Sequence, residues 1–347
     1  MSEPKGRGAA WTEERGSLRP SDEGRRRLKA ARRRADDTAN WADAPVTVRA
    51  PATSANLGPG FDALGLALTL YDVVEARVIS SGLVIEVSGA GEGTAAAEEG
   101  HLVIRAMRTA FARLGGQPPG IGLRCVNAIP HGYGLGSSAA AIVAGLLAAR
   151  ALAAEGADLT DGDVLRLATR LEGHPDNVAA CLAGGLTIAW TADSGAQAAR
   201  LAPVPGLAPV LCVPEIPLAT EHARGLLPPT VPHADAAANA ARAALLIAAL
   251  TNDPALLMAG TEDLLHQPYR APAMPATAEL ISQLRAAGIP AVVSGAGPSV
   301  LALTVPGIHP GPEACPPIAE KTGVNWRITP VAVDLYGATV EPPHDRG

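Results

Sequence analysis

The chain contains few aromatic residues. Phe, Trp and Tyr together make up 3% of its 347 residues, whereas hydrophobic residues as a whole reach 48%. The core must therefore be built mainly from Ala, Val, Leu and Ile. Charged residues are also sparse, at 18%, and the length is enough for two domains of about 150 residues each. This composition predicts a globular chain with ample apolar material for its core.

The chain also lacks the segments that carry a protein into a membrane. No window of about 18 residues is free of both charges and Pro or Gly breaks, as a spanning helix would normally be. Residues 1–40 are hydrophilic and contain no apolar stretch of the secretory type. We therefore expect a cytoplasmic protein without a membrane partner.

Patterned cysteines are missing as well. The four cysteines, Cys125, Cys181, Cys212 and Cys315, are widely spaced and form no C-x-x-C pair. A disulfide framework or a structural zinc site would need a closer pattern. We expect reduced, mostly buried thiols.

Positive charge is scarce except at the start of the chain. Residues 1–40 hold 11 Lys or Arg and 7 Asp or Glu, and the remaining residues hold 17 and 27. The basic stretch Arg25 to Arg34 is typical of an arm that binds nucleic acid or a membrane surface. The acidic body would repel such an anionic partner. We therefore favour the alternatives, an extension without fixed structure or sequence upstream of the native start, and expect no nucleic-acid partner.

Predicted strands and helices alternate without a regular β-α-β rhythm, which favours an α+β fold over a doubly wound parallel sheet. A boundary near residues 190–215 would divide the chain into two halves. The patterns predict strands near 46–48, 70–80, 83–89, 120–130, 184–190, 208–216 and 291–304, helices at 101–114, 137–155, 160–172, 236–250, 255–265 and 277–288, and a closing strand pair at 327–340.

A glycine-rich loop precedes the most apolar of these helices. In PHGYGLGSSAA, from Pro130 to Ala140, three glycines lead into Ser137 and Ser138. The unpaired N–H groups and the dipole of a helix N-terminus suit a phosphate, and no acidic residue competes there. The loop lacks the lysine of a Walker A motif and the third glycine of a dinucleotide fingerprint. The alternative is a glycine turn that only allows close packing of helix and sheet.

Polar residues also surround a Gly-Pro-Gly turn and a break between two helices. Asn56 and Asp62 bracket the turn, where an amide and a carboxylate could point into one cleft or could cap local backbone. The second group is Glu172, His174, Asp176 and Asn177. With a serine hydroxyl and phosphate oxygens, a carboxylate there would suit Mg²⁺ better than zinc. The alternative is that Asp176 or Asn177 caps the following helix.

Two arginines stand apart in an otherwise acidic body. Arg224 follows Thr220 by four residues, and Arg270 ends the segment LHQPYR. An arginine can hold a carboxylate through two parallel hydrogen bonds, although each alone could equally be a surface residue. A second glycine-rich turn, SGAGPS at 294–299, lies between two apolar strands.

Each motif is weak alone, but their order resembles that of the GHMP small-molecule kinases over about residues 45–335. That family carries an N-terminal substrate motif, here 51–68, a P-x-x-x-G-L-G-S-S-A-A phosphate loop, here 130–140, and a C-terminal glycine turn, here 294–299. The segments SANLGPGFDALGLAL, EGHPDNVA and LHQPYR resemble the branch that phosphorylates L-homoserine. The resemblance implies a ribosomal-protein-S5-like N-terminal domain at 44–205 and a ferredoxin-like C-terminal domain at 206–340, after a basic extension at 1–43.

The resemblance further implies ATP-dependent phosphorylation of the L-homoserine side-chain hydroxyl, a step of threonine biosynthesis, by a homodimer that uses Mg²⁺. Ser138 and Glu172 match the magnesium positions and, with Asn177, the catalytic ones. The expected ATP contacts are Pro130, His131, Gly132, Tyr133, Gly134, Leu135, Gly136, Ser137, Ser138, Gly295 and Gly297. The expected homoserine contacts are Asn56, Asp62, His174, Asn177, Thr220, Arg224 and Arg270.

Within these assignments, Arg224 and Arg270 would take the substrate carboxylate and Asp62 its ammonium group. Asn177 stands where other GHMP kinases place an aspartate base. An amide takes no proton, so we expect the proton to pass to a phosphate oxygen. Two alternatives remain open: a GHMP kinase for another acceptor, such as mevalonate, and a non-catalytic nucleotide-binding regulator.

Overall fold

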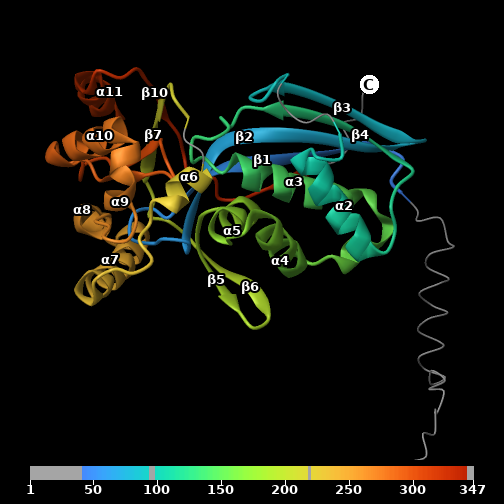
Figure 1. The fold of residues 1–347 in the computed structure, drawn as a ribbon, viewed down its shortest axis with the longest axis horizontal. Coiled ribbons are helices and arrows are strands. Elements are labelled where there is room, and N and C mark those ends of the chain that lie inside the picture. The colour runs from blue at the N-terminus through green and yellow to red at the C-terminus, as the bar shows by residue number, and fades with distance from the viewer. Residues whose placement is uncertain (1–40, 94–97, 218–219, 342–347) are drawn as a thin grey trace, which may run out of the picture. The chain divides into compact units, whose positions relative to one another are not determined.

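The computed structural model describes residues 41–93, 98–217 and 220–341, without the side chains of 220–222. Of the predicted basic extension at 1–43, only the last three residues fall within this part. The described residues form two β-sheets with helices packed on them, as Figure 1 shows. This arrangement confirms the predicted α+β class.

The larger sheet has the order β11-β1-β2-β4-β3, with β5 joined to the start of β2 and β6 joined to β5. All of its pairs are antiparallel except β3 with β4. Its strands are β1 (Val46–Ala55), β2 (Leu64–Ile79), β3 (Gly82–Gly89), β4 (Gly120–Asn127), β5 (Leu186–Ala192), β6 (Gly195–Leu201) and β11 (Thr339–Glu341).

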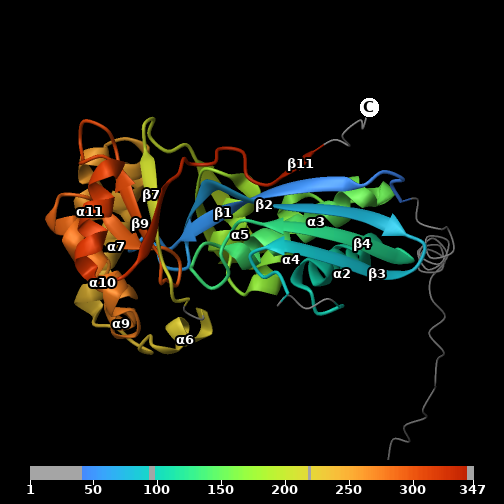
Figure 2. The same ribbon diagram turned by 90° about the horizontal axis from the view of Figure 1, so that it is seen from above.

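Helices α2 (Leu102–Leu114), α3 (Ser137–Leu152), α4 (Asp161–Glu172) and α5 (Asp176–Ala183) cover one face of this sheet, as Figures 1 and 2 show. Helix α3 lies at the centre of this layer and is buried almost all round, which explains its Ala, Leu, Ile and Val content. Helix α4 begins at a capping box between Thr160 and Asp163. An N-cap residue at Thr160 or Asp161 is the sequence signal that predicts the start of this helix.

The smaller sheet has the order β10-β7-β9-β8 with antiparallel neighbours. Strands β7 (Ala208–Pro214) and β8 (Ala291–Val293) flank β9 (Val300–Thr304), and β10 (Trp326–Pro330) is at the other edge. This split β-α-β order is that of a ferredoxin-like domain. The accompanying helices are α6 (Thr220–Gly225), α7 (His233–Thr251), α8 (Leu257–Gly260), α9 (Gln267–Arg270), α10 (Pro275–Ala286) and α11 (Cys315–Ala319).

Two predicted elements differ from the structure. A helix was expected at 255–265; the 3-10 turn η2 (Pro254–Leu256) and α8 form its first part, but α8 ends at Gly260. The carboxylate of Asp263 then accepts N–H bonds from the backbone of Leu265, His266 and Gln267, which favours a turn over a continued helix.

The predicted strand pair at 327–340 is wrong because its two strands join different sheets. Strand β10 pairs with β7, and β11 pairs with β1. Between them the buried carboxylate of Asp334 accepts hydrogen bonds from the backbone of Tyr336 and Gly337 and from the Tyr71 hydroxyl, which turns the chain toward the larger sheet.

Helix α7 alone among the described helices has the length and mean hydropathy, 1.2, of a candidate membrane span. It carries Asp235 and Arg242, and it buries Asn239, Leu246 and Leu250 against neighbouring elements. A helix that packs on a protein core meets the same criteria, so α7 is weak evidence for a membrane segment.

Candidate active site

A glycine loop, residues 128–136, connects β4 to α3 and is fixed at both ends. At its start, Asp72 of β2 accepts hydrogen bonds of 2.8 and 2.9 Å from two successive backbone N–H groups. Burial raises the pKa of Asp72 to about 6. At its end, the carbonyl of Leu135 accepts the N–H of Thr53 at 3.0 Å. Strands β1 and β2 therefore hold the loop at the N-terminus of α3.

Gly136 is the N-cap of α3 and has φ +70°. A Cβ atom at this position would lie 2.0 Å from Oγ1 of Thr53, so only glycine fits. The first turn of α3 contains Ser137 and Ser138 and no acidic residue. The unpaired N–H groups and the positive end of the helix dipole therefore meet no competing carboxylate and can bind an anion.

The two glycine-rich turns, 160 positions apart, are in direct contact. The Ser294 hydroxyl donates to the Gly134 carbonyl at 2.7 Å and lies 2.9 Å from the Ser54 hydroxyl. A Cβ atom on Gly134 would lie 2.1 Å from the Ser294 carbonyl oxygen. The second turn thus packs directly on the first.

Ser138 and Glu172 form a pair of hard oxygen donors beside the helix terminus. The Ser138 hydroxyl donates to Oε2 of Glu172 at 2.5 Å, and burial raises the pKa of Glu172. In the described part of the chain, no three His, Cys, Asp or Glu side chains gather into a metal cluster. A cation bound here would need further oxygen ligands, such as those of a bound phosphate.

Asp176 orients its neighbours but does not cap α5, because the N-cap residue is Pro175 and no side-chain cap bond is present. Its Oδ1 accepts the backbone N–H of Asn177 at 2.7 Å and lies 2.6 Å from Nδ1 of His174, whose pKa it raises. The side chain of Asn177 accepts the Thr53 hydroxyl at 2.8 Å through Oδ1. Its Nδ2 donor therefore remains for the cleft.

Asp62 and Arg224, predicted to bind opposite ends of a substrate, bind each other. The guanidinium of Arg224 donates to both carboxylate oxygens, at 2.8 and 3.0 Å, and this pairing raises its pKa. Both side chains are partly exposed, at 45% for Arg224 and 35% for Asp62. The pair is therefore accessible to a ligand.

Arg270, by contrast, is a buried cation, with 2% of its surface exposed. Its Nε donates to the Ala223 carbonyl at 3.1 Å, and its NH1 lies 3.1 Å from Nδ1 of His266. No carboxylate of the described side chains lies within ion-pair distance of it. Because a buried charge without an acidic partner is costly, a bound carboxylate would stabilise it.

His266 positions Arg270 and was not singled out by the sequence. Its Nε2 lies 2.9 Å from the Gly58 carbonyl, which can only accept, so Nε2 carries the proton. Its Nδ1 is then the acceptor for Arg270, and burial lowers the pKa of His266, which keeps this neutral form. The signal was available in LHQPYR, where the two residues are four positions apart.

Asn56 bridges two segments instead of facing the cleft with free polar atoms. Its Nδ2 donates to the Gly295 carbonyl at 2.8 Å, and its Oδ1 accepts the backbone N–H of Asp62 at 2.9 Å. The local backbone contact considered as an alternative is thus present at Asn56, whereas the side chain of Asp62 binds Arg224. Asn56, Leu57 and Asp62 have positive φ angles of 66°, 51° and 53°. Such backbone is costly for non-glycine residues and is often found at functional sites.

Most of the predicted residues line one cleft together. These are Asn56, Asp62, Gly132, Gly134, Leu135, Gly136, Ser137, Ser138, Glu172, His174, Asn177, Arg224, Arg270 and Gly295. Asp176, a candidate to which no role was assigned, also lines it, as does Ala296, which was not predicted.

The remaining predicted residues lie elsewhere. Pro130 and Tyr133 line a neighbouring groove, where the Tyr133 hydroxyl donates to the Glu215 carbonyl at 2.8 Å. Gly297 packs against Met274 outside the cleft lining. Thr220 begins α6, but its side chain lies outside the described set.

A cavity of 300 Å³ adjoins the cleft and shares Ser137 and Ser138 with it. His131, predicted to contact ATP, lines this cavity, as does the unpredicted His101. Burial lowers the pKa of both histidines. Nδ1 of His101 is buried and has no hydrogen-bond partner. This unpaired group indicates a place for a polar ligand.

Comparisons with known proteins identify the family. The model of the GHMP kinases N terminal domain matches residues 101–185, and that of the GHMP kinases C terminal matches residues 235–309. A homoserine kinase of Streptomyces coelicolor is 55% identical over 86% of this chain and 95% of its own. One of Clavibacter michiganensis is 50% identical over 85% and 94%.

Solved structures agree with these matches. The crystal structure of homoserine kinase from Cytophaga hutchinsonii superposes with a TM-score of 0.77 at 28% identity, over 86% of this chain and 98% of that one. A mevalonate kinase of L. major, at 15% identity and a TM-score of 0.63, shares the fold alone. The chain belongs to the homoserine kinases of the GHMP kinase family.

Proposed function

We propose that the chain transfers the γ-phosphoryl group of ATP to the side-chain hydroxyl of L-homoserine and so forms O-phospho-L-homoserine. The observation that carries this proposal is the joint position of the Asp62–Arg224 pair and Arg270 beside the N-terminus of α3. One end of the cleft can neutralise a zwitterion and the other can bind phosphate. An acceptor with both an amine and a carboxylate fits this arrangement.

The Asp62–Arg224 pair suits a zwitterionic substrate because each charge can exchange partners. When homoserine enters, its ammonium group replaces Arg224 at Asp62, and its carboxylate binds Arg224 and Arg270. No charge is then left without a partner, so opening the pair costs little. An acceptor without an amine, such as mevalonate, would leave Asp62 unpaired, which disfavours that alternative.

ATP fits the remaining part of the site. Its phosphates would bind the N–H groups of the glycine loop and of the first turn of α3, with Ser137 and Ser138 adding hydroxyls. Its base would occupy the adjoining 300 Å³ cavity, where Nδ1 of His101 offers an unused hydrogen-bonding atom. The two spaces meet at the serines, as the ends of one nucleotide require.

Ser138 and Glu172 fit Mg²⁺, because a hydroxyl and a carboxylate are the hard oxygen donors that this ion prefers. The bound ion would neutralise charge on the phosphates. Phosphoryl transfer otherwise depends mainly on positioning. The side chains of this chain provide that positioning, because they hold the carboxylate, the ammonium group and the hydroxyl of the acceptor in fixed places.

Asn177 would orient the acceptor hydroxyl through its Nδ2 donor, because its Oδ1 is taken by Thr53. It cannot act as a base. With homoserine bound, Asp62 holds the ammonium group and Glu172 faces the metal site. Asp176 is engaged by His174 and by backbone. The hydroxyl proton therefore passes to a phosphate oxygen.

The domain limits at 44–205 and 206–340, the homodimer and the cytoplasmic location stay predictions. In this proposal the larger sheet and α3 bind the nucleotide, and the smaller domain closes the cleft through α6, α9 and the second glycine turn.

An ADP-release assay tests the function directly. Homoserine, serine, threonine and mevalonate are offered with ATP and Mg²⁺ to the wild-type chain and to Glu172→Ala. We expect ADP release that depends on homoserine, and a loss of about 100-fold or more in Glu172→Ala because the acidic metal ligand is gone. If mevalonate released ADP and homoserine did not, the proposal would be wrong.

A further inference from the structure

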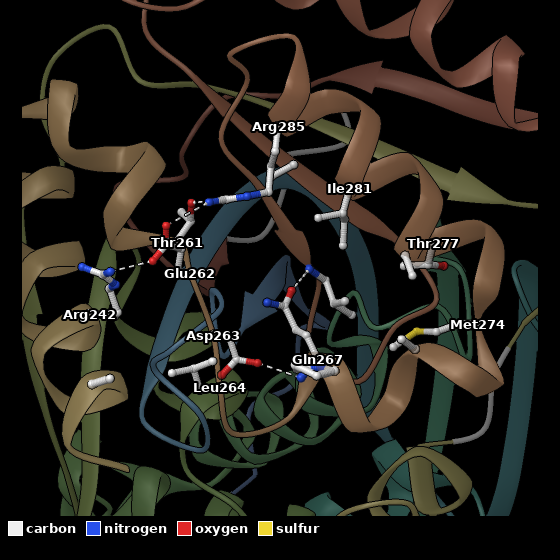
Figure 3. A pocket seen from close by; sticks show the side chains of 16 residues that line it. Arg242, Thr261, Glu262, Asp263, Leu264, Gln267, Met274, Thr277, Ile281 and Arg285 are labelled. Carbon is white, nitrogen blue, oxygen red and sulfur yellow. Dashed lines mark hydrogen bonds and ion pairs between the residues drawn. The ribbon is translucent and has the colours of Figure 1, made fainter. Parts of the chain in front are cut away.

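A second cavity, separate from the cleft, lies between α7, α10 and the segment 261–274 (Figure 3). Its volume is 410 Å³, within the range of about 300–1,000 Å³ that is usual for small-molecule sites. No residue that lines it also lines the cleft. The phosphoryl-transfer reaction leaves this cavity, named here the α10 cavity, without a role.

One side of the α10 cavity is apolar. Met274, Ile281, Ala278 and Leu264 contribute side chains to it. Figure 3 shows Met274, Thr277 and Ile281 together on one side, across from a charged group. An aliphatic ligand body would bury apolar surface against this wall.

The charged side contains two arginines and one glutamate. The carboxylate of Glu262 lies 2.7 Å from NH2 of Arg242 and 3.9 Å from NH2 of Arg285. Asp263 also lines the cavity, but its carboxylate is engaged by three backbone N–H groups. Arg285 also donates to the Thr261 hydroxyl and the Met258 carbonyl, both at 2.7 Å. Glu262 is thus the one carboxylate that faces both guanidinium groups, and arginine binds a further carboxylate well.

We propose that the α10 cavity binds a small carboxylate with an aliphatic body. Its carboxylate would bind Arg242 and Arg285, and its body would pack on Met274, Ala278 and Ile281. An amino acid with a branched apolar side chain and a simple branched fatty acid share this chemistry.

Two residues in the walls of the α10 cavity form hydrogen bonds with the backbone at the two ends of the second glycine turn. Oε1 of Gln267 accepts the backbone N–H of Val293 at 2.6 Å, and Oγ1 of Thr277 donates to the Pro298 carbonyl at 2.6 Å. The turn between these points contributes Gly295 to the cleft. A ligand that fits the cavity in this state stabilises the formed turn, so it lowers the KM for homoserine. This coupling, unlike the binding itself, rests on the proposed function.

Calorimetry on the full chain, without ATP or homoserine, tests the binding. The probes are 4-methylpentanoate, L-leucine and 3-methylbutylamine, which share one aliphatic body. We expect saturable binding of the two carboxylates and none of the amine. The carboxylate that binds more tightly shows whether the natural ligand is an amino acid or a fatty acid. No saturable binding of either, or equal binding of the amine, would overturn the proposal.

Three variants locate the binding. Arg242→Gln should raise the Kd by about tenfold, as expected for the loss of one charge-assisted hydrogen bond. Ala278→Leu should abolish binding because its longer side chain would take the place of the ligand's aliphatic body on this wall of the cavity. Ala244→Leu, on an exposed part of α7 away from the cavity, is the matched control and should bind like wild type.

Thermal melts confirm that each variant folds. If Ala278→Leu folds and keeps wild-type affinity, the ligand is bound elsewhere and the proposal is wrong. If Ala278→Leu does not fold, the affinity of folded Arg242→Gln decides in the same way. A kinetic arm then measures the KM for homoserine with and without the carboxylate. If the wild type showed no homoserine turnover at all, the proposed function would fail, whereas the calorimetric result would stand.

Discussion

His266 offers a sharp test of how the cleft binds the substrate carboxylate, because one of its ring nitrogens accepts a hydrogen bond and the other donates one. Nδ1 accepts from Arg270 at 3.1 Å, and Nε2 donates to the Gly58 carbonyl at 2.9 Å. Asparagine can place an oxygen near Nδ1, and glutamine can place an N–H near Nε2. His266→Asn therefore keeps the acceptor for Arg270, and His266→Gln keeps the donor to Gly58.

The expected magnitudes follow from these two bonds. A hydrogen bond to a charged group contributes about 1.5–3 kcal/mol, so His266→Gln should raise the KM for homoserine by roughly 10- to 100-fold. The kcat should change little, because Arg270 binds the carboxylate and not the reacting hydroxyl. His266→Asn should keep the KM within about threefold of wild type but lose roughly 1 kcal/mol of stability with the bond to Gly58.

Steady-state kinetics at saturating ATP give KM and kcat, and urea denaturation gives the stability of each variant. The two variants should rank in opposite order by KM and by stability. Equal effects on KM, or a loss confined to kcat, would refute a positioning role for His266. Burial lowers the pKa of His266, so the difference in KM between the wild type and His266→Gln should not change through pH 6.5, where an ordinary histidine titrates.

Three further outcomes are expected. Asn177→Asp should lower kcat at every pH, because it replaces a donor to the hydroxyl by a negative charge; intact turnover with a new pH dependence would argue instead for a base at this position. Gly136→Ala should cost about 2–4 kcal/mol in urea denaturation, because its Cβ meets Thr53 and its φ is positive. Gly206→Ala, with φ +82° and open space around it, should cost only about 1–2 kcal/mol, and equal losses would exclude the contact with Thr53 as the cause. Because the pKa of Asp72 is about 6 when folded and 3.8 as a free side chain, the folded state binds more protons between these values and stability falls by about 3 kcal/mol as pH rises through them. Asp72→Asn should remove that fall in denaturation curves taken from pH 4 to 7, and an unchanged pH profile would contradict the assignment.

Local patterns predicted the parts of the site that depend on neighbouring residues. The glycine loop before α3 and the N-cap at Thr160 follow from short sequence signals, and the structure contains both. The helix predicted at 255–265 is wrong after Gly260, because its apolar spacing was outweighed by Asp263, whose carboxylate satisfies backbone N–H groups outside a helix.

Contacts between distant residues could not be predicted from such signals. Asp62 and Arg224 are 162 positions apart, and His266 and Gly58 are 208 apart. Composition and spacing showed that charges were available, but not that two of them would pair. The order of motifs indicated a common cleft only through the family resemblance. The role of His266 could be assigned only once its tautomer was known, and the tautomer follows from its contacts in the fold.

The pairing of β11 with β1 has a consequence for how the protein is made. Arg49 is opposite Thr339 at the edge of the larger sheet, so a strand from the end of the chain completes a sheet begun near its start. A ribosome that adds roughly 5–20 residues per second needs about 15–60 s to travel between them. During that interval the outer edge of β1 is an unpaired strand, which is open to pairing with other chains. The larger sheet therefore obtains its last strand only after the whole smaller sheet has been synthesised.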